Sequence, residues 1–425
     1  MTNDNQHIPA GYKPSPLGPI PEDWEVKRLG EVCDFLRTNT LSRNQLNDTN
    51  GDIQNIHYGD VLVKYPSIID AQKESIPFIN KEEYKESMND FIEDGDIIMA
   101  DTAEDETVGK ACEITNVNSK KILAGLHTML IRPQKGLFSS LFLGYQVNST
   151  SYHKQLNALI QGIKVCSVGK QAIANTYLSL PPLEEQQRIV SVLSLWDTAI
   201  KKQTALIEQL TLRKRGLMQQ LLTGKKRLKG FEGEWEEVKL GNLGKFAGGC
   251  VFSENEQGGQ TGIPFYKVSD MNTPGNELKM TIANNYVTQE QIECLGYIVI
   301  EDEAIIFAKV GAAIALERKR HAKNFIIDNN MLAFIPNEDI WYMKYWFDSI
   351  RLSKYIQVGA LPSYNASDLS TIKLNIPSRK EQTAIASVLV NADKEIEIQK
   401  QKLAAMQAQK KGLMQVLLTG KRRIV

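Results

Sequence analysis

Apolar residues recur at two different spacings along this chain of 425 residues. In the stretches 181–227 and 377–425 the apolar positions alternate in steps of four and three. That spacing is the a/d pattern of a coiled coil, in which apolar residues form one seam along a helix. The pattern predicts two helices of roughly 40 residues, each about 60 Å long at 1.5 Å per residue.

The two predicted seams carry polar residues at matching places. Gln203 corresponds to Gln399, and Lys214 corresponds to Lys410. Polar seam residues cost stability but can fix register, and the alternative is that they are tolerated edge residues. The predicted seam consists of Ile189, Leu193, Trp196, Ile200, Gln203, Ile207, Leu210 and Lys214 in the first helix, and Ile385, Leu389, Ile396, Gln399, Leu403, Met406 and Lys410 in the second.

Residues typical of helix ends flank both stretches. Pro181 and Pro377 stand just before the pattern, where the missing N–H of proline costs little. Gly224 and Gly420 follow the pattern, and the cations beyond them suit a helix C-terminus.

We expect the two helices to pair antiparallel. The register that lets a positions meet d positions has facing residue numbers that add to 606. In that register Lys410 reaches Trp196, and a lysine over an indole ring is a favourable contact.

The chain contains an internal repeat. GLMQQLLTGKKR begins at Gly216 and GLMQVLLTGKRR at Gly412, while WEVKRLGEV begins at Trp24 and WEEVKLGNL at Trp235. The order is therefore module, helix, module, helix. The predicted domains are an N-terminal extension (1–19), a first module (20–180), a first helix (181–227), a second module (228–376) and a second helix (377–425).

Short β-branched runs within the modules predict strands, and the runs of one module match those of the other. IQNIHYGDVLV resembles GIPFYKVSDM, GDIIMAD resembles EAIIFAK, and HTMLIRP resembles NNMLAFIP. A helix is expected late in each module, over 141–160 and 341–356. The fold class is thus α+β: two mixed α/β modules separated by two long helices that form an antiparallel coiled coil with pseudo-twofold cyclic symmetry.

Composition narrows the class of protein. Lysine plus arginine balance aspartate plus glutamate at 50 each, so net charge gives no hint of nucleic acid, although residues 81–106 are acidic and both helix ends are basic. The five cysteines form no CxxC pair, and no apolar run is as long as a membrane span. We expect an intracellular, cytoplasmic protein without a metal site.

Enzyme signatures are not convincing. No GxxxxGK[ST] segment is present, and the five histidines lack the spacing of metal ligands. NIPS at 375–378 lacks the aromatic residue that would stack on a flipped base, and the triplet at 237–239 lacks the aspartate of a nuclease. The expectation is a non-catalytic protein.

The order of these repeats resembles the specificity subunit of type I restriction-modification enzymes. The matching segments are the helix openings LPPLEEQQRI and IPSRKEQTAI, the closings GLMQ-x-LLTGK, and the module starts at Trp24 and Trp235. Together they span about residue 20 to 425. The second opening departs from the first at Ser378–Lys380, and this difference bears on whether both helices present identical contacts to a partner protein.

This resemblance implies a function and partners. Each module would be a target recognition domain that reads one half of a bipartite, asymmetric site in double-stranded DNA, and the helices would set the gap between the halves. Two adenine methyltransferase subunits would bind this chain, and two motor-nuclease subunits would bind through them. S-adenosylmethionine and ATP would then sit on those partners, so this chain itself would hold no cofactor.

Side chains that can reach base edges or phosphates cluster in a few loops. The alternative for each is a solvated surface residue or a turn former. Residues 81–106 should face away from phosphate. The candidates are Arg37, Thr38, Asn39, Arg43, Asn44, Lys164 and Lys170 in the first module, and Lys267, Lys309, Arg318, Arg320, Ser363, Tyr364 and Asn365 in the second.

Three other functions fit the repeats. The chain could be a free-standing pseudo-dimeric DNA-binding regulator that needs no enzyme, or the recognition portion split from a single-chain restriction enzyme. It could also be a scaffold whose modules bind protein, in which case it would show no salt-dependent DNA affinity.

Overall fold

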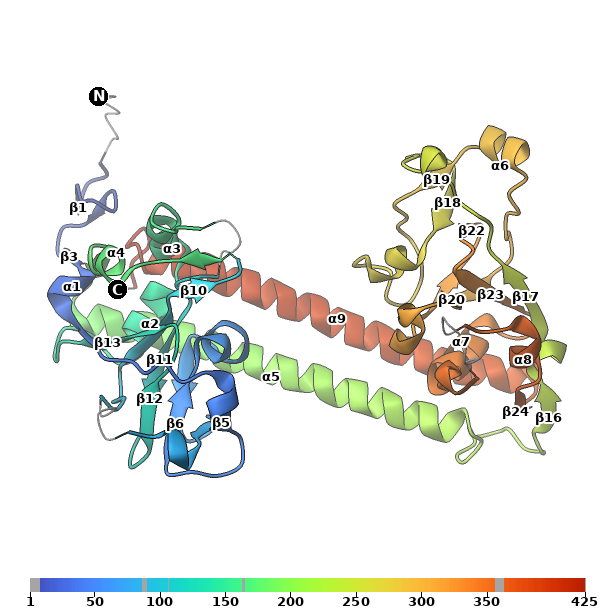
Figure 1. Ribbon diagram of the computed structural model, residues 1–425, viewed down its shortest axis with the longest axis horizontal. Coiled ribbons are helices and arrows are strands. Elements are labelled where there is room, and N and C mark those ends of the chain that lie inside the picture. Colours follow the sequence, from blue (N-terminus) through green and yellow to red (C-terminus); the bar gives the residue numbers. More distant parts are fainter. Residues whose placement is uncertain (1–7, 86–89, 106, 163–164, 356–362, 425) are drawn as a thin grey trace. The chain divides into compact units, whose positions relative to one another are not determined.

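The structure is a computed structural model that describes residues 8–85, 90–105, 107–162, 165–355 and 363–424. It contains two compact units (Figure 1). Unit 1 is Met1–Gln203 with Lys402–Val425, and unit 2 is Thr204–Gln401. Each unit therefore contains one module and a part of each long helix.

The two long helices form where the heptads predict them. Helix α5 spans Leu183–Leu221 and α9 spans Arg379–Leu417, 39 residues each. Gly224 and Gly420 follow them with φ of +69° and +68°, the left-handed conformation expected of a glycine that ends a helix. Among the described residues no helix is both long and apolar enough to cross a membrane.

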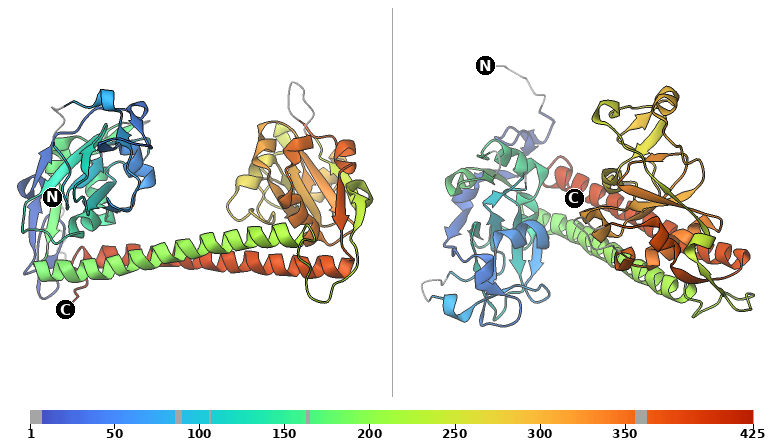
Figure 2. Two further views of the ribbon diagram at one scale, coloured as in Figure 1. Left: turned by 90° about the horizontal axis from the view of Figure 1, so that it is seen from below. Right: turned by 45° about the vertical axis from the view of Figure 1, so that its right-hand side comes forward.

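Within each unit the parts of α5 and α9 run antiparallel and lie side by side (Figure 2). In unit 1 Asp197 of α5 forms an ion pair with Lys410 of α9. In unit 2 Lys214 pairs with Asp393 at 2.6 Å. Both ion pairs join residues whose numbers add to 607 rather than 606. The Lys410–Trp196 contact predicted from the sequence is wrong, because the Lys410 ammonium lies over the ring of Tyr145, 5.0 Å from its centre.

Unit 1 is built on a five-stranded and a four-stranded sheet. Pairing is antiparallel except for the parallel pairs β11–β7 and β12–β6. The first sheet has the order β4 (Cys33–Leu36), β13 (Thr128–Pro133), β9 (Ile97–Ala100), β11 (Ala111–Thr115), β7 (Ile68–Asp70), and the second has β12 (Lys121–Ala124), β6 (Ile53–Ile56), β8 (Phe78–Ile79), β5 (Leu46–Asn47). Two-stranded pairs are β15 (Tyr177–Leu180) with β3 (Glu25–Arg28), β10 (Thr102–Ala103) with β14 (Cys166–Ser167), and β1 (Tyr12–Lys13) with β2 (Ile20–Pro21).

Unit 2 repeats the same strand order with fewer strands. Its four-stranded sheet has the order β17 (Gly244–Gly248), β23 (Met331–Pro336), β20 (Ala304–Ala308), β21 (Lys319–Ala322). Its three-stranded sheet has the order β19 (Tyr286–Val287), β18 (Ile263–Tyr266), β22 (Ile326–Ile327). A two-stranded pair joins β16 (Glu236–Lys239) with β24 (Lys373–Ile376). The β18–β22 pair is parallel, as β12–β6 is in unit 1. The two modules therefore share one scaffold, as the matched strand sequences predicted.

The helices late in each module are shorter than predicted. The stretch 141–160 divides into α2 (Phe142–Val147) and α3 (Thr150–Asn157), because the Ser149 side chain accepts the N–H of Tyr152 and starts a new helix. Helix α7 covers Ile340–Ser349, and a 3₁₀ turn over Leu352–Tyr355 follows it. The remaining helices are α1 (Leu29–Val32), α4 (Lys170–Ala174), α6 (Gln289–Leu295) and α8 (Ala366–Ser370).

Helices α2 and α7 connect the sheets to α5 and α9. In unit 1 Phe142 and Tyr145 of α2 are buried in one cluster with Ile189 and Leu193 of α5 and Leu417 of α9. In unit 2 the aromatic residues of α7 are buried with Phe334 of the sheet and with residues at the start of α9, Ile385 and Leu389. Burial of such side chains is the main stabilising contribution, so each module is packed firmly against its helix pair.

Candidate nucleic-acid interface

Several polar side chains of unit 1 meet at one end of its two sheets. We call His57, Asp101, Thr102 and His127 the β9 edge, because they follow β6 and β9 or precede β13. Asp101 Oδ1 accepts from the Thr102 hydroxyl at 2.8 Å and lies 3.4 Å from His127 Nδ1. The ring of Tyr58 bridges the two histidines, 4.5 Å from His57 and 5.4 Å from His127 between ring centres.

Two features of the histidines define the chemistry of this edge. Burial lowers the pKa of His57, and its Nδ1 accepts the N–H of Gly59 at 3.2 Å, so the neutral ring carries its proton on Nε2. His127 is exposed and has a φ of +53°, which is unusual for a residue other than glycine. Backbone strain of this kind is often found where a side chain must be presented in a fixed direction.

The same end of unit 2 carries different side chains. We call Lys267, Lys309, Val310 and Asn330 the β20 edge. The Lys309 N–H donates to the Asn330 carbonyl at 2.8 Å, as the Asp101 N–H donates to the His127 carbonyl at 3.1 Å in unit 1. The Asn330 amide lies 3.4 Å from the buried Asp328, whose carboxyl pKa is raised by burial. The two edges thus share backbone geometry and differ in charge.

Module-one residues predicted to contact DNA divide into exposed and structural ones. Arg37 is exposed and donates to Asp90, whose pKa is lowered by this hydrogen bond. Asn39 is buried and donates to Asn55 at 2.7 Å, which counts against a base contact. The Arg43 guanidinium is half exposed and donates to both Asp60 oxygens, at 3.0 and 3.1 Å. The other candidates are Thr38, Asn44 and Lys170, which are exposed, and Lys164, which lies outside the described residues.

Lys170 is also engaged within the protein. It begins α4, and its ammonium lies 5.1 Å from the centre of the Phe35 ring and 3.3 Å from the Phe35 carbonyl oxygen. The acidic segment 81–106 is partly neutralised, because Arg132 pairs with Glu93 and with the buried Asp96 at 2.7 Å each.

In module two the structure brings some predicted residues to the β20 edge. Lys267 and Lys309 belong to it, and Ser363 pairs with Val310 in an isolated β-bridge. Arg318 precedes β21 and donates to Asn272. Burial lowers the pKa of Arg320, which lies within β21.

Two further residues of module two that were predicted to contact DNA have structural roles instead. Tyr364 is buried and packs edge-on to Phe307, with ring centres 6.2 Å apart. The Asn365 side chain accepts the N–H of Ser367 and caps α8. Both placements count against direct contact with a base.

Sequence reasoning missed all four residues of the β9 edge, and it missed Val310 and Asn330 of the β20 edge. The signal was present in the matched strand sequences, because GDIIMAD ends on Asp101 where EAIIFAK ends on Lys309. A change of chemistry at the last position of a shared strand could have identified the edge.

None of the predicted seam residues is fully exposed in α5 or α9. The seam residues that are half-buried are Trp196, Ile200, Ile207, Lys214, Gln399, Leu403, Met406 and Lys410. The buried ones are Ile189, Leu193, Gln203, Leu210, Ile385, Leu389 and Ile396.

A tyrosine, an aspartate and a lysine join the module to the helix pair in each unit. In unit 1 the Tyr145 hydroxyl donates to Asp197 at 2.6 Å, and Lys410 pairs with the same carboxylate. In unit 2 Tyr345 donates to Asp393 at 2.6 Å, and Lys214 lies 5.1 Å from the centre of the Tyr345 ring. Burial, and then the carboxylate, raise the pKa of both tyrosines, so both stay protonated donors.

A second joint is also repeated. In unit 1 the buried Glu185 accepts from the Trp24 indole at 2.9 Å and from Arg423 at 2.6 Å, and Arg423 also pairs with Asp23. Arg423 therefore joins the segment after α9 to the start of the first module and to α5.

In unit 2 Glu381 accepts from Arg227 at 2.6 and 2.7 Å. The Arg227 guanidinium lies 5.7 Å from the centre of the Trp235 ring, so it joins the module start to α9.

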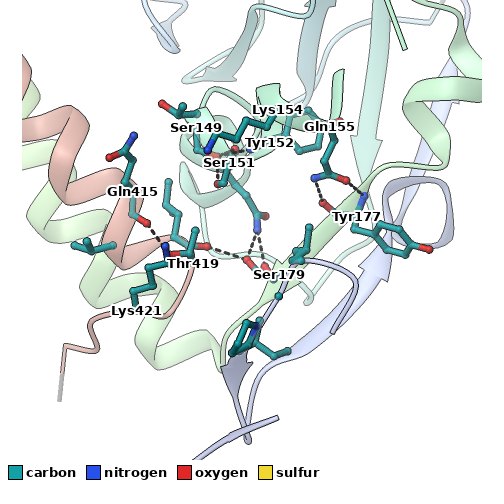
Figure 3. Close-up of a pocket in the computed structure, with 18 residues that line it drawn as sticks. Ser149, Ser151, Tyr152, Lys154, Gln155, Tyr177, Ser179, Gln415, Thr419 and Lys421 are labelled. Carbon is teal, nitrogen blue, oxygen red and sulfur yellow. Dashed lines mark hydrogen bonds between the residues drawn. The ribbon is translucent and has the colours of Figure 1, made fainter. Parts of the chain in front are cut away.

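Unit 1 also contains a pocket of about 530 Å³ between the segment before β3, helix α3 and the end of α9 (Figure 3). Gln146 is buried beside it and donates to the Ser179 carbonyl and hydroxyl at 2.7 and 2.8 Å. The Ser179 hydroxyl in turn donates to the Leu418 carbonyl. None of the described residues predicted to contact DNA lines this pocket. Elsewhere in the described chain, no group of three His, Cys, Asp or Glu side chains could hold a metal ion.

The family model for the type I restriction modification DNA specificity domain matches the chain twice, at residues 21–212 and 232–408. The chain belongs to this family. The specificity subunit is 27% identical to the putative type I restriction enzyme MjaX specificity subunit of Methanocaldococcus jannaschii, over 97% of each chain. It is 25% identical to the MjaVIII specificity subunit of that organism, over 95% of this chain and 94% of the relative.

Solved structures show the same fold. A chain from work on the assembly and conformational transition of a type I restriction-modification system matches with a TM-score of 0.61 at 17% identity, over 95% of this subunit and 99% of that chain. The specificity subunit of M. genitalium matches with a TM-score of 0.52 at 14% identity, over 93% and 96%. The free-standing regulator considered from the sequence finds no support in these matches.

Proposed function

We propose that each unit of this specificity subunit reads one half of a bipartite, asymmetric DNA site. The observation that carries the proposal is the repetition of one scaffold with unlike strand ends: Asp101 and His127 in unit 1 stand where unit 2 has Lys309 and Asn330. A shared scaffold with different polar side chains is what two different half-sites require, because each base pair presents its own donor and acceptor pattern in the major groove.

The repeated joints support the docking of two equal partners. The triads of Tyr145 and Tyr345 fix each module to its helix pair in the same way. Glu185 and Glu381 also correspond, because each accepts from an arginine that follows the other long helix. We propose that two methyltransferase subunits bind this chain, that two motor-nuclease subunits bind through them, and that α5 and α9 set the gap between half-sites. S-adenosylmethionine and ATP then bind those partners in the cytoplasm, and this chain is not catalytic.

A methylome tests this function. The chain would be co-expressed with its methyltransferase partner, and the host DNA would be sequenced for modified adenines. The expected result is a split motif with one modified adenine on opposite strands of its two halves. Exchanging residues 235–376 for those of another specificity subunit should change one half only. Absence of a motif with this chain, while the same methyltransferase modifies DNA with another specificity subunit, would contradict the proposal.

A further inference from the structure

The β9 and β20 edges share their backbone hydrogen bonds but carry side chains of opposite charge at one equivalent position. Asp101 and Lys309 occupy equivalent positions, since each follows an inner strand of its sheet. The carbonyl of each also accepts a backbone hydrogen bond at 2.9 Å from the segment that precedes the next helix, from Val168 in unit 1 and from Tyr364 in unit 2. The scaffold therefore holds a carboxylate in unit 1 where it holds an ammonium in unit 2.

Asp101 cannot serve a phosphate contact. A carboxylate repels the DNA backbone, so an acidic residue on a DNA-facing edge is favourable only where it accepts from an exocyclic amino group, N4 of cytosine or N6 of adenine. The Asp101 side chain is about a quarter exposed, at 27%, and the Thr102 hydroxyl orients it. His127 stands beside it in a left-handed conformation.

Lys309 offers the edge a hydrogen-bond donor where Asp101 offers an acceptor. Among the residues that the structure describes, nothing bonds to its ammonium, whereas the neighbouring Lys267 donates to Gln257 at 3.0 Å. A lysine that reaches the major groove pairs best with guanine, which offers the O6 and N7 acceptors together.

We propose that the β9 and β20 edges are the base-reading surfaces of the two units, with Asp101 selecting a base that carries an exocyclic amino group in one half-site and Lys309 selecting guanine in the other. This inference rests on the proposed function, because it assigns specificity to residues of units that read half-sites. It excludes the helix-proximal residues Tyr364 and Asn365 from base contact.

The test uses Asp101→Ala and Lys309→Gln in the full chain, in complex with its methyltransferase. Matched controls change the same charge at the far end of other strands of the same units, away from the two edges. Asp52→Ala alters the exposed residue before β6, and Lys323→Gln alters the exposed residue after β21, next to the start of β20. Motifs are read from the methylome, and affinities are measured on duplexes that carry single base-pair changes.

Lys309→Gln should weaken the preference for guanine at one position by about tenfold or more and leave the other half-site unchanged. Asp101→Ala should relax one position in the other half-site, and both controls should keep the parent motif and affinity. Where a variant lowers the melting temperature of the complex, Lys309→Arg and Asp101→Glu replace it, and these should retain the parent base preference.

Two results would overturn the inference and leave the proposed function intact. One is a parent split motif that both variants retain at parental affinity. The other is a uniform loss of affinity for every sequence with a smaller salt dependence, which would place Lys309 on phosphate. Failure of the parent chain itself to give a split motif would instead overturn the function and, with it, this inference.

Discussion

At the scale of single residues, the aspartates of the two triads should differ in their contribution to stability. The Asp393 side chain is 20% exposed and that of Asp197 is 44% exposed, so water screens the unit 1 ion pair more strongly. Asp393→Asn should lower the free energy of unfolding by about 1–3 kcal/mol, and Asp197→Asn by less than about 1 kcal/mol. Denaturant unfolding of the purified chain measures both. Equal losses of unfolding free energy, or a larger loss for Asp197→Asn, would contradict the prediction that the less exposed ion pair contributes more.

A second residue gives a prediction about pH. Burial lowers the pKa of His321, whose ring is tilted against that of Trp341 with ring centres 4.9 Å apart. Glu303 raises this pKa, and Lys279 and Lys344 lower it. The folded protein therefore binds this proton more weakly than the unfolded chain does. The stabilising effect is complete above the ordinary pKa of about 6.5 and is lost as pH falls toward the folded value.

His321→Leu should remove this part of the pH dependence, by at most about 1.4 kcal/mol per pH unit. Unfolding free energies at pH 7.5 and 5.5 measure it, and Glu303→Gln serves as the control because it should steepen the dependence. A slope in His321→Leu equal to that of the parent protein would show that the buried imidazole does not titrate on unfolding.

At the scale of elements, the glycines that end α5 and α9 are not equivalent. Both have positive φ, so alanine at either position costs about 1 kcal/mol. A Cβ at Gly420 would also lie 2.5 Å from Pro21, whereas at Gly224 its nearest neighbour is Trp235 at 3.5 Å. Gly420→Ala should therefore be the more destabilising change in thermal unfolding.

The glycines inside the same helices supply the control. A Cβ at Gly216 or Gly412 would meet nothing within 4 Å, so alanine there should stabilise each helix by about 0.5–1 kcal/mol. A loss of stability at these two positions would mean that α5 and α9 are not continuous helices in solution.

These elements also show how far the sequence could be interpreted. The helices were predictable because the seam positions of each keep one period and because proline and glycine mark the ends. The break after α2 was missed, although Ser149, which starts α3, is a residue type that often begins a helix. What the sequence does not show is that the preceding Asn148 is held by the main chain of Ala111 in a distant strand. The change from Asp101 to Lys309 at the end of a matched strand was visible in the sequence, but the approach of Asp101 to His127 was not, because it forms only when β9 pairs with β13.

At the scale of the whole molecule, the proposed role of α5 and α9 can be tested by lengthening both. One heptad inserted after Gln203 and another after Gln401 preserves the seam period and adds about 10 Å to each helix. Because we propose that the helices set the gap between half-sites, the gap in the methylated motif should grow by about three base pairs of 3.4 Å, and both half-sites should stay the same.

A heptad inserted into α5 alone is the control for this experiment. It would slip the pairing that joins Lys214 to Asp393 and Asp197 to Lys410, so it should abolish methylation or strongly reduce it. If the double insertion methylates DNA at the parental gap, something other than helix length sets the spacing. A changed half-site would mean that the inserted turns alter how a module is held, because Tyr145 and Tyr345 bind the helices next to the modules.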